Sequence, residues 1–96
     1  MNVRDKNSEN YAYRDKNSEN YAYILLAKNL KKYRKLAGLT QQELSDKSLY
    51  SLSFIKNLES ESVYQTASIG TAYKFAQILN IPLSKLFEES NENESN

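Results

Sequence analysis

The stretch LTQQELSDKSLYSLSFIKNLE, residues 39–59, contains two helix-sized patterns with almost no room for a loop between them. The first pattern begins at Thr40, which can form a T-x-x-E capping box with Glu43. Ser51 then suits the N-cap of a second helix, predicted over residues 52–60. Two helices joined by so short a turn cannot lie antiparallel. We therefore expect them to cross steeply, with the second helix projecting from the surface.

The inward side of this pair is predicted from its apolar spacing. Leu44 in the first helix and Ile55 and Leu58 in the second would face the core, and small Ser45 lies where the helices approach closely. A steeply crossed pair of this kind leaves its second helix free to enter a DNA major groove. The stretch is therefore interpreted as a helix-turn-helix.

Helical periodicity continues on both sides of the pair. Upstream, residues 24–37 form an amphipathic helix with lysines opposite its apolar arc, and Gly38 is placed to end it. This helix could also begin within residues 21–23. Downstream, residues 69–79 follow Ser68 as N-cap, and Pro82 suits the first turn of a fifth helix. No segment alternates with a period of two, so we expect an all-α fold, a compact bundle of five short helices. The residues expected to be buried in the two longer flanking helices are Leu26, Leu30, Tyr33, Ala37, Ile69, Ala72 or Tyr73, Ala76 and Leu79.

The chain is predicted to have three parts. Residues 1–23 are a polar, charge-balanced arm containing a perfect tandem repeat, RDKNSENYAY at 4–13 and 14–23. We expect this arm to be largely disordered, and an arm that orders on a partner is the alternative. Residues 24–87 form the helical domain with nine basic and four acidic residues, and residues 88–96 form a disordered tail with four acids and no base. A basic body with an acidic tail suits a nucleic-acid binder, although solvated faces and a solubilising tail explain the charges equally well.

Length and composition exclude several classes of function. A chain of 96 residues makes at most one small domain. It contains no cysteine and no histidine, so it lacks the usual zinc ligands and the commonest general base at neutral pH. We therefore expect no metal site, no cofactor and no enzymatic activity. No apolar run approaches the length of a membrane span and the amino terminus is polar, so we expect a soluble, cytoplasmic protein with no membrane contact.

Three segments resemble the DNA-binding domain of phage Cro and repressor proteins, the Xre family: LKKYRKLAGLTQQELSDKS at 30–48, SFIKNLE at 53–59 and FAQILNIPLSKLF at 75–87. The resemblance covers about residues 26–87. It implies five helices, sequence-specific binding of double-stranded DNA by the third helix, and usually a homodimer on an inverted repeat. A small transcriptional regulator, most often a repressor, is the function that it implies.

The same resemblance implies which residues contact DNA. Gln41 matches a glutamine that packs against phosphate and supports the helix that reads DNA, and its alternative is an ordinary exposed residue of the first turn. Asn57 could pair bidentately with adenine, and Lys56 could reach guanine or phosphate. Leu52 could meet a thymine methyl group, or else pack against Tyr50. The residues carried over as the DNA-binding set are Gln41, Ser51, Leu52, Ser53, Lys56 and Asn57.

The resemblance also implies an internal ion pair between Arg34 and Glu59, which we assign to structure. Three features depart from the family pattern. Leu49 stands where glycine is usual, so the turn must change shape or carry strain. The loop SESVYQTA, residues 60–67, has no basic residue to hold phosphate, and the lysines of residues 24–37 are expected to be solvated rather than bound to DNA.

A second class of function therefore stays open. An antitoxin or adaptor module would use the same helices mainly to bind a protein partner. The loop without basic residues and the tyrosine-rich arm favour this reading.

Overall fold

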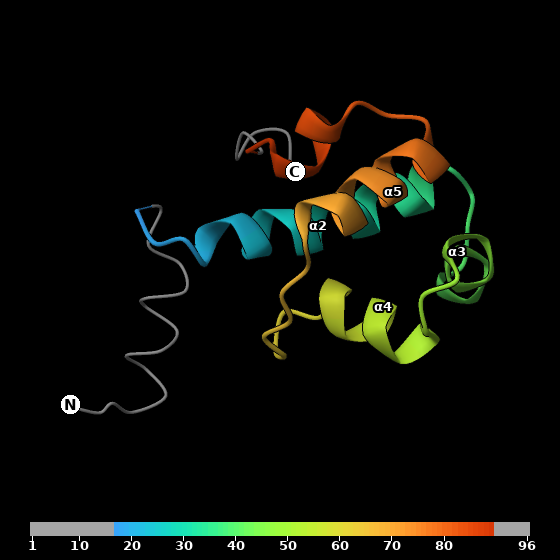
Figure 1. Cartoon of the computed structure of the whole chain (residues 1–96), viewed down its shortest axis with the longest axis horizontal. Coiled ribbons are helices and arrows are strands. Elements are labelled where there is room, and N and C mark those ends of the chain that lie inside the picture. Colours follow the sequence, from blue (N-terminus) through green and yellow to red (C-terminus); the bar gives the residue numbers. More distant parts are fainter. Residues whose placement is uncertain (1–16, 90–96) are drawn as a thin grey trace.

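A computed structural model describes residues 17–89, which form four α-helices and one short 3-10 helix (Figure 1). The elements are α2 at Tyr21–Leu36, α3 at Gln41–Ser48, α4 at Leu52–Glu59, α5 at Ile69–Leu79 and η1 at Leu83–Phe87. The described residues contain no strand, so the all-α prediction is confirmed. The first copy of the tandem repeat and the last seven residues of the acidic tail, both predicted to be disordered, lie outside the described residues.

The predicted fifth helix is corrected to a 3-10 helix. Pro82 has an extended backbone, and the amide of Lys85 donates to the carbonyl of Pro82 at 3.0 Å, an i→i+3 bond typical of 3-10 geometry. Only five residues separate this proline from the extended residue Glu88, which is too short a span for a regular α-helix of several turns. η1 nevertheless buries Leu86 in the core.

The ends of the helices follow local sequence signals. Thr40 accepts from the amide of Glu43 at 3.0 Å, and Glu43 Oε1 accepts from the amide of Thr40 at 2.8 Å, which confirms the predicted capping box. Ser51 and Ser68 cap α4 and α5 through their side chains, also as predicted. α2 begins at Tyr21, the start that the sequence offered as an alternative to residue 24, so Tyr21–Tyr23 belong to this helix and not to the polar arm.

The helices enclose one apolar core, and α3 and α4 cross steeply. In Figure 1 α3 is seen nearly along its axis, whereas α4 lies across the view. A buried leucine or phenylalanine contributes roughly 1.5–3 kcal/mol before its lost entropy is subtracted, so this core is the main source of stability. The residues that form it are Leu26, Leu30, Leu44, Ile55, Leu58, Ala72, Phe75, Ala76, Leu79 and Leu86.

Two of the residues predicted to be buried are exposed. The side chain of Ile69 is 77% exposed, because it is the first residue of α5 and helix side chains lean toward the N-terminus, away from the core. Ala37 follows the last turn of α2 and is exposed as well. Of Ala72 and Tyr73, between which the prediction left the choice open, Ala72 is buried, and Phe75 of the same helix is buried as well.

The turn between α3 and α4 keeps the left-handed shape that glycine usually provides. Leu49 has φ 68° and its side chain is 85% exposed. A non-glycine residue in this conformation costs roughly 1–2 kcal/mol. The strain predicted for this position is therefore present, and burial of the leucine side chain does not offset it.

Candidate functional site

The inner face of α4 is fixed to the rest of the domain by apolar contacts and by one ion pair. Ile55 and Leu58 are buried in the core. Glu59, the last residue of α4, is 5% exposed and faces Arg34 of α2, which is 6% exposed. A buried charge needs a partner, and these two provide one for each other.

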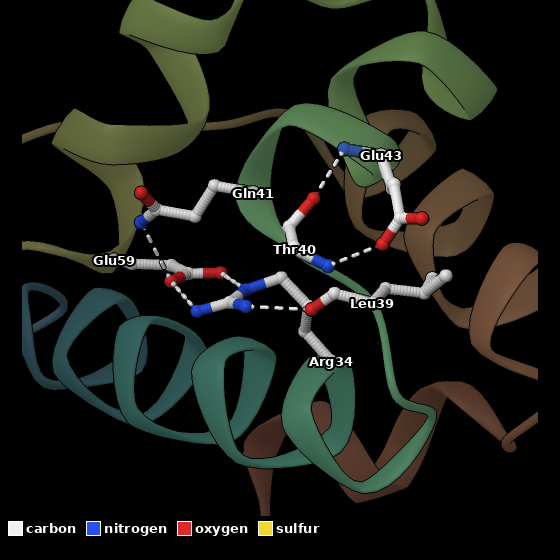
Figure 2. A network of polar contacts seen from close by, with 6 residues as sticks. All are labelled: Arg34, Leu39, Thr40, Gln41, Glu43 and Glu59. Atoms are coloured by element: carbon white, nitrogen blue, oxygen red, sulfur yellow. Dashed lines mark hydrogen bonds and ion pairs between the residues drawn. The ribbon is translucent and has the colours of Figure 1, made fainter.

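The geometry of this ion pair leaves little freedom to either side chain. Arg34 Nε donates to Glu59 Oε2 at 2.8 Å and Arg34 Nη2 donates to Glu59 Oε1 at 3.0 Å, a bidentate contact (Figure 2). Arg34 Nη1 donates to the backbone carbonyl of Leu39 at 2.7 Å. The pair thus joins α2, the segment before α3 and the end of α4.

Gln41 belongs to the same network. Its Nε2 donates to Glu59 Oε1 at 3.0 Å, and Figure 2 shows it reaching from the start of α3 toward the end of α4. The side chain is half-buried. The structure therefore joins Gln41 to the end of α4, the helix that the resemblance implies it supports, and its contact with phosphate stays a prediction.

The outer face of α4 carries three of the six predicted DNA-binding residues. Helical spacing places Ser53, Lys56 and Asn57 on the side away from Ile55 and Leu58. Ser53 and Lys56 are exposed and Asn57 is half-buried.

The start of α4 adds two more of these residues. Ser51 is exposed, and its Oγ accepts from the amide of Phe54 at 3.0 Å, so the hydroxyl also caps the helix. Leu52 is half-buried. Five of the six predicted residues thus lie on one helix and its cap, and Gln41 stands at the opposite end of α4, beside Glu59.

An aromatic cluster behind the start of α4 was missed by the sequence analysis. The Tyr50 ring lies 5.4 Å from that of Phe54 and 5.5 Å from that of Phe75, measured between centroids. The i, i+4 spacing of Tyr50 and Phe54 was a usable signal. The contact of Tyr50 with Phe75 of α5 could not be predicted from spacing, because it joins residues distant in sequence.

A second polar cluster lies where α2 contacts η1 and the segment after it. Tyr33 and Lys85 both contact the carboxylate of Glu88, and Asn29 Nδ2 donates to the carbonyls of Leu86 and Glu88. The hydrogen bond from Tyr33 is the largest cause that lowers the pKa of Glu88, and Lys85 and Lys32 act in the same direction. This cluster holds the C-terminal segment against α2.

Residues 17–89 contain neither a cluster of metal ligands nor a helix that could span a membrane. Within residues 17–89, no group of three or more acidic side chains is placed to hold a metal ion. None of the described helices is both long and apolar enough to span a bilayer.

Among known proteins, the chain matches a family model, whereas no curated protein and no solved structure matches it. A family model described as helix-turn-helix matches residues 30–86, more than half of the chain, and this range contains the capping box, the steep α3–α4 crossing and the outer face of α4. The chain therefore belongs to the helix-turn-helix family of Xre and lambda-repressor-like DNA-binding domains.

Proposed function

We propose that this protein is a small transcriptional repressor that binds a specific sequence of double-stranded DNA, with α4 in the major groove. One observation carries the proposal: α4 is fixed along its inner face and presents exposed Ser53 and Lys56 on its outer face. A rigid helix with polar side chains on its free face suits the readout of base edges.

Each outer residue has a chemical role in this proposal. The Asn57 amide pairs with adenine, Leu52 contacts a thymine methyl group, and Lys56 reaches guanine or phosphate. Ser51 and Ser53 bond to base edges or to nearby phosphate. Gln41, at the positive N-terminal end of α3, approaches phosphate while its amide remains close to Glu59.

The proposal extends to the assembly. A homodimer would place two copies of α4 ~34 Å apart, one helical turn of DNA, and so would bind an inverted repeat. Such a regulator acts in the cytoplasm and needs no cofactor.

Selection of bound duplexes from a random pool, repeated at two salt concentrations, tests the function. We expect a recovered inverted repeat and an affinity that falls steeply as salt rises. A pool that remains random at both salt concentrations would contradict sequence-specific binding.

A second candidate, an antitoxin or adaptor module, is favoured by apolar side chains at the surface. Ile69 is 77% exposed, and Val63 and Tyr64 are exposed in the loop before it. Glu61 in the same loop opposes contact with phosphate. Co-purification with a stoichiometric protein partner, together with no salt-sensitive DNA binding, would favour this function over the first.

A further inference from the structure

The turn between α3 and α4 sets the direction in which α4 leaves the domain. Leu49 is held in a left-handed conformation that a leucine does not prefer, and only Tyr50 separates it from Ser51, the N-cap of α4. A small rotation at Tyr50 would therefore redirect the first turn of α4, where Ser51, Leu52 and Ser53 lie.

The backbone of Tyr50 is fixed to α3 through two buried serines. Its amide donates to Ser48 Oγ at 3.2 Å, and its carbonyl accepts from Ser45 Oγ at 2.6 Å. Both backbone polar groups of Tyr50 are thus satisfied by side chains of the preceding helix. The turn is coupled to the position of α3.

The side chain of Tyr50 is fixed to α5. Its hydroxyl is hydrogen-bonded to Thr71 Oγ1 at 2.9 Å, its ring packs on Phe75, and Lys74 Nζ lies 5.2 Å from the ring centroid. The same ring packs on Phe54 of α4. Tyr50 therefore contacts three helices at the point where α4 begins.

We propose that Tyr50 is a positioning residue for DNA recognition, and that its hydrogen bond to Thr71 aligns α4 with α5. The inference rests on the function proposed above. It extends that function, because Tyr50 would contribute to the discrimination between DNA sequences without itself contacting DNA.

The test compares Tyr50→Phe, which removes only the hydroxyl, with Tyr73→Phe as matched control. Tyr73 is on α5 and 53% exposed, and within residues 17–89 its hydroxyl has no hydrogen bond. Residual dipolar couplings of the backbone amides report the orientation of α4 relative to α5 without any DNA. Binding to the selected duplex and to a scrambled duplex reports specificity.

We expect Tyr50→Phe to change or average the orientation of α4, and to reduce discrimination between the two duplexes by roughly two- to tenfold, the range of one lost hydrogen bond. Binding to the scrambled duplex should stay within about twofold, because phosphate contacts carry it. Thr71→Val should cause at least the same loss, because it also removes the hydrogen bond that Ser68 Oγ donates to Thr71 Oγ1 at 3.0 Å. The double variant should lose no more than Thr71→Val. Tyr73→Phe should match the unmodified protein.

An unchanged orientation of α4, or equal weakening on both duplexes, would overturn the positioning role. Unchanged discrimination despite a reoriented α4 would overturn it too. If the unmodified protein itself binds both duplexes equally, the proposed function fails, and the dipolar couplings alone then decide whether Tyr50 positions α4.

Discussion

The two faces of α4 are built in opposite ways. The inner face is buried, and its one charge, Glu59, is bound by both Arg34 and Gln41. The outer face presents Ser53 and Lys56 to solvent. The residues that serve stability and those proposed for recognition thus lie on opposite faces of one eight-residue helix. Changes on the inner face should act mainly on folding, and changes on the outer face mainly on binding.

The largest effect is expected from removing the carboxylate of Glu59 on the inner face. Glu59→Ala would leave Arg34 buried without its partner, which costs about 3–5 kcal/mol. For a small domain this is a large fraction of the total free energy of unfolding. Urea unfolding followed by circular dichroism measures the loss.

The exposed residue Glu61, two positions further along the chain, is the matched control. Glu61→Ala should change the free energy of unfolding by less than about 0.5 kcal/mol. Similar losses in the two variants would show that the ion pair does not hold the inner face.

The inner face was largely predictable from sequence, because it follows local rules. Helical spacing identified Ile55 and Leu58, and capping residues located the starts of α3, α4 and α5. The rules failed at the ends of helices. Ile69 has suitable spacing but projects beyond the core, and the segment after Pro82 is too short for an α-helix.

The contacts that orient α4 were less predictable. The side chain of Gln41 on α3 is hydrogen-bonded to Glu59 on α4, and the side chain of Tyr50 is hydrogen-bonded to Thr71 on α5. Neither pair has a fixed spacing, so only the packed structure brings its members together. The roles of the outer residues came from the family resemblance, and they stay predictions.

A smaller effect is expected in the turn between α3 and α4, which belongs to neither face of α4. Leu49→Gly should stabilise the protein by about 1 kcal/mol, because glycine adopts the left-handed conformation without strain and little buried surface is lost. Thermal unfolding measures the gain. The preferred DNA sequence should not change, since the outer face is intact. A lower melting temperature would show that Leu49 contributes contacts that offset its strain.

The smallest effect is expected at Glu88, a half-buried carboxylate that contrasts with fully buried Glu59. The pKa of Glu88 is lowered, first by the hydrogen bond from Tyr33. The unfolded chain therefore binds a proton more readily than the folded one. The stabilisation that ionised Glu88 contributes is fully present above the ordinary pKa of 4.5. It is lost as pH falls through the lower pKa of Glu88 in the folded protein.

Urea unfolding of the unmodified protein and of Glu88→Gln, at neutral pH and in acid, tests this contrast. The unmodified protein should be the more stable of the two at neutral pH, and the difference should shrink in acid. Tyr33→Phe should reduce the dependence on pH, because it removes the largest cause of the shift. A difference that is constant over the whole pH range would contradict the assignment.

The proposed function requires that side chains on the outer face of α4 read bases. The selection from a random pool, repeated with Asn57→Ala and with Lys56→Ala, tests this requirement. We expect Asn57→Ala to lose preference at one base pair in each half-site, equivalent to about 1–3 kcal/mol, and Lys56→Ala to keep the selected sequence while binding all duplexes more weakly. An unchanged preference at every position with Asn57→Ala would contradict the claim.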